Sequence, residues 1–265
     1  MQHMKEVKKQ CLKTLLNMYK EANAGHIGAS LSCIDILIYL LFYKIKSEED
    51  KIILSKGHAA LALYITLSKS GRIPEHLLKT FYKEGTSLAA HPPCNNSIEA
   101  IPFGTGSLGH GLSLATGLAF SQKYTSKKYN VYCIISEGDC NEGSTWEAAL
   151  FAAQHNIRNL TVIVDRNNLQ GFGKSSDILN LEPLIDKFKS FGFETAVVEN
   201  GNDFKSLHAS FEEIDLHFSE KPRCIIAKTT KGSCVSYMEN KMEWHYYPMS
   251  DEQYQQALKE TEFDA

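Results

Sequence analysis

Residues 130–136 read NVYCIIS and residues 160–165 read LTVIVD, and these two segments decide the fold class. Both are unbroken runs rich in β-branched and other apolar residues, as in strands buried on both faces of a parallel sheet. Between them, Trp146, Leu150 and Ala153 recur at the spacing of one helix face. The sequence therefore predicts a strand–helix–strand unit with a right-handed crossover.

Similar patterns continue on both sides of this unit. Further strands are predicted over 194–198 and 224–228, with a helix over 204–218 between them. Helices are also predicted over 7–22, 32–43 and 59–68, the second with its acid Asp35 near the start; 84–106 is expected to be a long irregular loop. We expect an α/β protein, a parallel sheet with helices on both faces, forming a single domain.

Composition narrows the possible functions. The 265 residues are 43% hydrophobic and 22% charged, with a net charge of −3, so no basic field is available for nucleic acid. The longest apolar run, 36–43, is far shorter than the roughly 20 residues of a membrane span. The seven cysteines form no CxxC pair, and no secretory signal is visible at the start. These features indicate a cytoplasmic protein that binds neither nucleic acid nor membrane.

Polar residues follow both central strands. The first strand leads into Ser136-Glu137-Gly138-Asp139 and the second into Asp165-Arg166-Asn167-Asn168. The carboxyl ends of adjacent parallel strands lie together, and ligands of open α/β sheets bind there. Carboxylate and amide oxygens suit Mg²⁺, although the same residues also cap helices and solvate loops.

A glycine-rich segment precedes another predicted helix. Residues 104–111 read GTGSLGHG, a loop that lets a phosphate approach the backbone at a helix N-terminus. The spacing is neither a dinucleotide fingerprint nor a phosphate loop with its lysine, and such glycines also serve ordinary turns. Gly111 and Gly117 inside the helix each reduce helix propensity by about 1 kcal/mol, so we expect something to approach that face closely.

Four histidines lie in loops or at the starts of elements. His26, His58, His91 and His245 each lie in such a segment, the first three next to or near glycine or proline. Histidine suits proton transfer and hydroxyl binding near neutral pH. Any one of them alone would be interpreted as a surface residue, and it is the presence of four that favours a site.

Six segments, in order, resemble the amino-terminal half of transketolase. They read AGHIGASLSCIDIL, ILSKGHAALALY, GTGSLGHGLSLATGLA, CNEGSTWEAALFAAQH, LTVIVDRNNLQ and KTTKGSCVSYMENKMEWH. The resemblance extends over residues 5–260 as one domain. It implies the domain that binds the diphosphate of thiamin diphosphate, together with Mg²⁺ or, as an alternative ion, Ca²⁺.

The resemblance also implies a metal site with one altered position. Ser136-Glu137-Gly138 stands where the family has Gly-Asp-Gly, so Glu137 takes the place of the metal-binding aspartate. Asn167 and the carbonyl of Leu169 complete the implied ligands. A shifted alignment would make Asp139 the ligand instead, at the expense of a two-residue deletion. The extra methylene of Glu137 pushes its carboxylate toward an ion that requires near-ideal octahedral geometry, so we expect metal binding to survive but to be weaker.

The other site residues are carried over by position. The implied cofactor contacts are His58, Gly106, Ser107, Leu108, Gly138, Asn167 and His245. The implied catalytic residues are His26, His91 and His245, which engage sugar hydroxyls or move protons, and Glu142, which links cofactor sites across the interface between subunits.

The resemblance implies the transfer of a two-carbon ketol unit from a ketose phosphate to an aldose phosphate, a step in carbohydrate metabolism. In the family, a glutamate that activates the cofactor belongs to the following pyrimidine-binding domain, and the sequence ends at Ala265. We therefore expect a separate carboxy-terminal subunit of transketolase, joined to this chain in an α₂β₂ assembly. A subunit of another thiamin-dependent ketol or acyl transferase, or a non-catalytic subunit that binds the cofactor, are the alternative interpretations.

Overall fold

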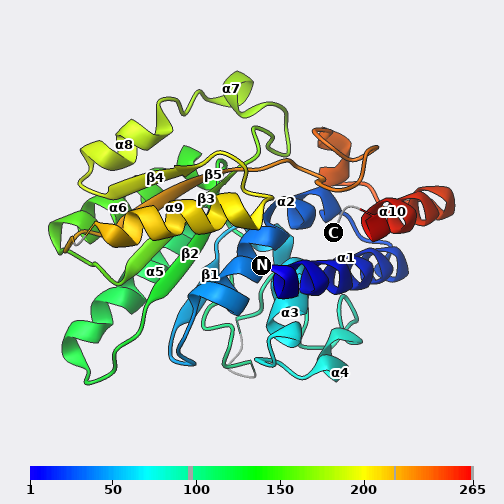
Figure 1. The fold of residues 1–265 in the computed structure, drawn as a ribbon, viewed down its shortest axis with the longest axis horizontal. Helices are drawn as coiled ribbons and strands as arrows, with labels where there is room; N and C mark the ends of the chain where they lie inside the picture. Colours follow the sequence, from blue (N-terminus) through cyan, green and yellow to red (C-terminus); the bar gives the residue numbers. More distant parts are fainter. Residues whose placement is uncertain (95–97, 218, 264–265) are drawn as a thin grey trace.

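A five-stranded parallel sheet forms the centre of the protein in the computed structural model, which describes residues 1–94, 98–217 and 219–263 (Figure 1). The strands are β1 (Lys51–Leu54), β2 (Val131–Ser136), β3 (Leu160–Arg166), β4 (Glu194–Val198) and β5 (Arg223–Lys228). Their order across the sheet is β1-β2-β3-β5-β4, and every neighbouring pair is parallel. The predicted α/β class with a parallel sheet is confirmed.

Alternation along β2 shows why these segments form buried strands. Tyr132 and Ile134 face one hydrophobic core, whereas Val131, Cys133 and Ile135 face the other. All five residues are buried. A strand with apolar contacts on both faces needs no polar alternation, which explains its continuous apolar sequence.

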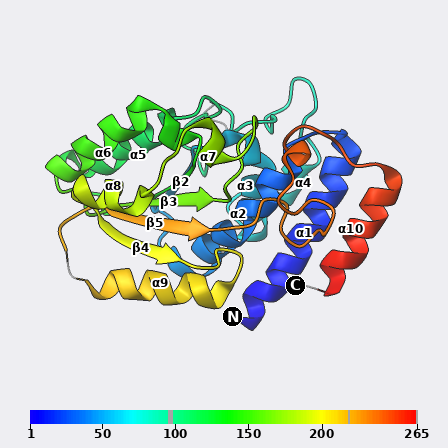
Figure 2. The same cartoon turned by 90° about the horizontal axis from the view of Figure 1, so that it is seen from above.

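Helices cover both faces of the sheet. The first core contains side chains of α1 (Gln2–Ala22), α2 (Ile27–Tyr39), α3 (Ala60–Lys69) and α9 (Phe204–Leu216). The second contains α5 (His110–Ser121), α6 (Gly143–Gln154) and α8 (Leu184–Ser190). Figure 2 shows α9 on one side of the sheet, α5 and α6 on the other, and α10 (Asp251–Phe263) beside α1. Short helices α4 (Glu75–Leu78) and α7 (Ser175–Ile178) lie in connections.

The second helix begins earlier than predicted. It starts at Ile27 rather than near residue 32, so Asp35 lies in its interior instead of at its N-terminus. Gly28 packs closely against Trp244, since a Cβ there would lie 3.1 Å from that side chain. This packing offsets the low helix propensity of the first turn. The predicted end of α9 at residue 218 lies outside the described residues, and the helix ends at Leu216.

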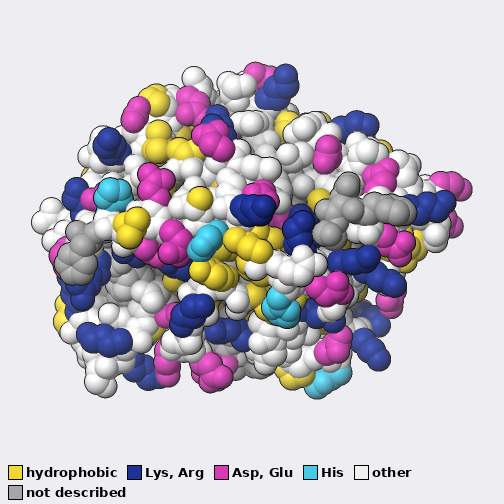
Figure 3. Space-filling view, in the orientation of Figure 1, with side chains coloured by type: hydrophobic (Ala, Val, Ile, Leu, Met, Phe, Trp, Pro, Cys, Tyr) yellow, Lys and Arg dark blue, Asp and Glu magenta, His cyan; other side chains and the backbone are white. Residues whose placement is uncertain are grey.

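Segment Ile27–Lys44 has the length and hydropathy of a membrane span, but 83% of it is buried inside the protein, as expected for a core helix. On the surface, lysine and arginine side chains alternate with aspartate and glutamate across the face in Figure 3. This mixture agrees with the small net charge of −3.

Candidate functional site

A cavity of about 240 Å³ lies at the carboxyl ends of the central strands. The segments that follow β1, β2, β3 and β5 all contribute side chains to it, and the long loop before α5 contributes His91 and Gly106. Ten of the predicted site residues line this one cavity: His26, His58, His91, Gly106, Leu108, Glu137, Gly138, Asn167, Leu169 and His245. Two others, Ser107 and Glu142, do not line it.

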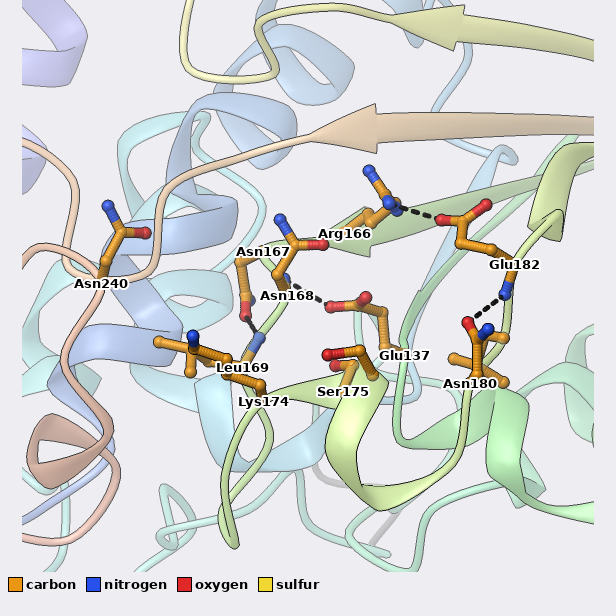
Figure 4. Close-up of a pocket in the computed structure, with 12 residues that line it drawn as sticks. Glu137, Arg166, Asn167, Asn168, Leu169, Lys174, Ser175, Asn180, Glu182 and Asn240 are labelled. Carbon is orange, nitrogen blue, oxygen red and sulfur yellow. Dashed lines mark hydrogen bonds and ion pairs between the residues drawn. The ribbon is translucent and has the colours of Figure 1, made fainter.

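The residues predicted to bind metal lie on two neighbouring turns, one after β2 and one after β3. Because Ser136 pairs with Asp165 across the sheet, the two strand exits are neighbours. The N–H of Asn168 donates to Glu137 Oε2 at 2.6 Å, and the N–H of Leu169 donates to Asn167 Oδ1 at 3.1 Å (Figure 4). Asn168 has a φ of 63°, the left-handed conformation that makes this tight turn. The carboxylate of Glu137 is thus held against the segment 167–169, which carries the amide and carbonyl oxygens.

The Asn167 amide has a fixed orientation. Its Nδ2 donates to the hydroxyl of Ser32 at 3.0 Å, so its oxygen is directed to the other side. Ser32 in turn donates to both oxygens of Asp165, at 2.7 and 2.8 Å. Residues far apart in the sequence therefore set which atom of Asn167 is available to a ligand.

Glu137 is a buried carboxylate that suits a bound cation. Its side chain is 5% exposed, and burial raises its pKa to about 6. Among the described residues, no lysine or arginine lies within ion-pair distance of it. No cluster of three or more His, Cys, Asp or Glu that could hold a metal occurs in the described part of the chain, whereas Mg²⁺ accepts one carboxylate with neutral oxygens and water. The donor set therefore fits Mg²⁺.

Asp139, the alternative metal ligand, is occupied elsewhere. It is fully buried and does not line the cavity. Its oxygens accept the N–H of Gly109 at 2.8 Å, the N–H and hydroxyl of Ser136 at 2.7 and 2.8 Å, and the hydroxyl of Ser55. Asp139 therefore ties the ends of β1 and β2 to the start of α5, which favours Glu137 as the metal ligand.

The start of α5 is not the open phosphate cradle that its sequence suggested. The N–H of Gly109 is bound to Asp139 and that of Gly111 donates to Ser55 Oγ at 3.2 Å. The close approach expected at Gly111 is made by Ser55, because a Cβ on this glycine would lie 2.3 Å from Ser55 Cβ. At Gly117, nothing described lies within 4 Å. Only the preceding loop, through Gly106 and Leu108, reaches the cavity.

The two predicted residues outside the cavity lie close to it. Ser107 is exposed and lines a neighbouring hollow of about 520 Å³ together with Gly106. Glu142 is exposed at the N-terminus of α6, and a Cβ on Gly109 would lie 2.5 Å from the Cβ of Glu142. Their assigned contacts with cofactor and interface stay predictions.

Four histidines converge although they come from four separate segments. The ring centroids of His26 lie 5.8, 6.0 and 5.1 Å from those of His58, His91 and His245, and His58 lies 5.0 Å from His245. Burial lowers the pKa of all four rings, and that of His245 falls to about 3. At neutral pH they are uncharged imidazoles that can donate and accept hydrogen bonds.

Two buried lysines were not predicted from the sequence. Lys56 is ion-paired with Asp165, whose carboxylate also binds Thr229. Lys231 lines the cavity at 1% exposure, and burial lowers its pKa to about 8. A lysine beside a glycine just after the predicted strand 224–228 was the available signal for Lys231.

Lys231 also sets the tautomer of His245. Its Nζ lies 3.0 Å from Nδ1 of that ring. An ammonium can only donate, so Nδ1 accepts and the neutral ring carries its proton on Nε2. The cavity thus has oxygen ligands for a cation, the Lys231 ammonium, which pairs with no carboxylate in the described part of the chain, and a group of neutral imidazoles. It is suited to an anion such as a diphosphate held partly through Mg²⁺, beside a polar ligand rich in hydroxyls.

Comparisons with known proteins agree with this description. Residues 7–265 match the family model described as transketolase, thiamine diphosphate binding domain. The chain is 36% identical over 257 residues to one of the subunits of the apulose-4-phosphate transketolase of Phocaeicola vulgatus, covering 94% of this chain and 90% of that protein. It is 33% identical to one of the subunits of the 6-deoxy-6-sulfo-D-fructose transketolase of Clostridium sp., covering 94% of this chain and 93% of that one.

The crystal structure of a transketolase from Campylobacter jejuni superposes with a TM-score of 0.88 at 30% identity. The match covers 99% of this chain and 43% of that one. The chain therefore spans less than half of the solved transketolase but nearly all of the two subunits.

Proposed function

Because the chain belongs to the transketolase family, through the thiamin diphosphate-binding domain, we propose that it is the cofactor-binding subunit of a two-chain transketolase. The reaction is transfer of a two-carbon ketol unit from a ketose phosphate to an aldose phosphate. The observation that carries the proposal is that Glu137 lies against the turn of Asn167 and Leu169 in one cavity, beside Lys231 and four histidines. We place this reaction in cytoplasmic carbohydrate metabolism.

The metal and diphosphate would be held by this chain's own groups. Glu137, Asn167 Oδ1 and the Leu169 carbonyl would bind Mg²⁺, while Lys231, His58 and the Gly106–Leu108 loop would face the diphosphate. When bound, thiamin diphosphate supplies the nucleophilic carbon for breaking and making the carbon–carbon bond. The protein supplies binding, orientation and proton positions.

The histidines would act on the sugar. His26 and His91 are half-buried, neutral at pH 7 and close together at the cavity. Neutral rings of this kind can accept a hydrogen bond from a substrate hydroxyl, and a proton that they take up in passing is returned readily because burial disfavours the imidazolium. His245, with its proton on Nε2, is suited to donate a hydrogen bond to a substrate oxygen.

A test of the proposal is metal-dependent binding of thiamin diphosphate. We expect Glu137→Ala to weaken binding at least roughly tenfold in a titration of Mg²⁺ and cofactor, because it removes the one carboxylate among the ligands. Asp139→Ala serves as the comparison at the neighbouring acid and is expected to lower thermal stability more than metal affinity. If only the Asp139 variant loses metal-dependent binding, the assignment of Glu137 is wrong.

The rest of the active site would come from a second chain. Relatives that this chain matches over about nine-tenths of their length are named as subunits of transketolases. We propose a carboxy-terminal partner with the pyrimidine-binding domain and an α₂β₂ assembly. A non-catalytic role is disfavoured by the oxygen ligands, which the change to Glu137 leaves in place.

A further inference from the structure

We propose that Tyr246 is a positioning residue for the metal-binding turn, which it holds through the backbone of Gly171. We call the contact between the Tyr246 hydroxyl and the Gly171 carbonyl the tyrosine latch. The inference rests on the proposed function, because the turn that the latch holds carries the Leu169 carbonyl. Its structural part can be tested without any ligand.

The contact is specific in geometry. The hydroxyl of Tyr246 donates to the carbonyl oxygen of Gly171 at 2.9 Å, across 75 residues of sequence. A Cβ on Gly171 would lie 2.6 Å from that hydroxyl and 3.2 Å from His245 Nε2. The backbone φ of Gly171 is outside the left-handed region, so the absence of a side chain is required by Tyr246 and not by the backbone.

The backbone around Tyr246 is fixed by contacts of the neighbouring residues. The preceding Trp244 is 4% exposed and its Nε1 donates to the Tyr237 carbonyl at 2.9 Å. The N–H of His26 donates to the His245 carbonyl at 3.2 Å, and a Cβ on Gly25 would lie 2.4 Å from the Tyr246 carbonyl oxygen. The ring of Tyr246 is 49% exposed, but its backbone is held by these contacts and by the buried Trp244 two residues before it.

The turn at the other end of the latch is weakly packed. Leu169 and Lys174 pair as an antiparallel bridge, and the N–H of Gln170 donates to the Gly173 carbonyl at 2.9 Å. These bonds close the hairpin on itself, and outside it Asn141 Nδ2 donates to Gln170 Oε1 at a longer 3.3 Å. Phe172 at its tip is 86% exposed, so apolar burial contributes little there. The latch therefore restrains Gly171 at the tip of the hairpin, two residues after Leu169.

Tyr246→Phe removes only the latch hydroxyl, and Tyr247→Phe is the matched control. Tyr247 is 63% exposed, and its hydroxyl has no hydrogen bond to the described part of the chain. In hydrogen–deuterium exchange of the unliganded chain, we expect amides in 168–175 of Tyr246→Phe to exchange roughly three- to tenfold faster, the effect of losing one hydrogen bond. Equal exchange in both variants and wild type would overturn the proposal.

Metal affinity separates positioning from a purely structural role. With thiamin diphosphate present, Mn²⁺ is expected to bind Tyr246→Phe roughly three- to tenfold more weakly than Tyr247→Phe. The thermal unfolding midpoints of the two variants are expected to agree. A lower midpoint with unchanged Mn²⁺ affinity would mean that Tyr246 is only structural, and would refute positioning.

The glycine provides an independent test. Gly171→Ala introduces a Cβ against the Tyr246 hydroxyl, so this substitution alone is expected to weaken Mn²⁺ binding. When it is added to Tyr246→Phe, its further effect on Mn²⁺ affinity is expected to be smaller. Additive effects would contradict the latch. If the wild-type chain fails to bind thiamin diphosphate and Mn²⁺, the proposed function fails, while the exchange experiment still decides the latch.

Discussion

At the scale of single residues, Lys231 shows a conflict between stability and ligand binding. The ammonium is 1% exposed, and burial lowers its pKa from 10.5 to about 8. The folded protein therefore releases this proton at lower pH than the unfolded chain does. A buried cation of this kind destabilises the unliganded protein, and an anion in the cavity would relieve that penalty.

We predict that Lys231→Met is more stable than wild type at pH 7 and binds the diphosphate less well. The difference in pKa corresponds to at most about 3 kcal/mol in the free energy of unfolding. Between pH 8 and 10.5 the unfolded chain binds more protons, so wild-type stability should rise toward that of the variant. Urea denaturation of both proteins at pH 7 and about pH 10 measures their free energies of unfolding. If the difference between wild type and Lys231→Met does not depend on pH, the prediction is wrong.

The sequence identified some site residues better than others. The four histidines were recognisable because they lie in loops and at element starts, where side chains reach ligands. Lys231 was missed because its burial depends on packing against α2, which is distant in the sequence, together with the segment around Trp244. The distinction between Glu137 and Asp139 needed the hydrogen bonds of Asp139, which come from three separate segments.

At the scale of elements, a buried ion pair joins α1 to α2. Lys8 Nζ lies 2.9 Å from Asp35 Oδ1, with Lys8 7% exposed and Asp35 fully buried. Asn202 also donates to Asp35 at 3.1 Å, which connects the pair to the loop after β4. Such a pair fixes which faces of the two helices meet, whatever its net contribution to stability.

Breaking one side of this pair should destabilise the protein strongly. We predict that Lys8→Met lowers the free energy of unfolding by about 3 kcal/mol, because Asp35 is left as a buried charge without its cation. Lys8→Met with Asp35→Leu should recover most of that loss, and the exposed Lys5→Met should have little effect. Urea denaturation of the three variants provides the measurement. A double variant no more stable than Lys8→Met would refute this account.

Helix positions were predicted well where apolar periodicity was strong and less well where polar or small residues begin a helix, as at α1, which begins at Gln2 instead of residue 7. α3 and α9 begin within one residue of their predicted starts, because regularly spaced apolar residues mark the buried face. The start of α2 was placed about five residues late. Gly28, Ala29 and Ser30 carry little helical signal by themselves, and the turn forms because tertiary packing requires small residues there.

At the scale of the whole molecule, the cavity lies at one edge of a sheet that this chain completes by itself. The fold was predictable because strands that are buried on both faces have continuous apolar sequences. The shape of the site depends on loops, which have no such pattern. This chain spans 43% of a solved transketolase but 90% of one chain of a transketolase made of subunits. We propose that a second chain covers the cavity at this edge of the sheet.

We predict that the isolated chain shows no ketol transfer, and that adding the partner chain restores it. The physical reason is that, in the arrangement we propose, the activating glutamate and part of the substrate site belong to the partner. Activity with a ketose phosphate and an aldose phosphate is the measurement, and Glu137→Ala mixed with the same partner is the control that should stay inactive. Full activity of the isolated chain would exclude a divided active site.

The placement of the two tryptophans gives the molecule an optical probe of its own site. Trp244 is buried directly beside His245 and Tyr246, whereas Trp146 stacks on Phe191 at 5.5 Å in the opposite core. In a Trp146→Phe background, fluorescence would come from Trp244 alone. Its emission would then follow filling of the cavity and motion of the neighbouring turn in real time, without an attached dye.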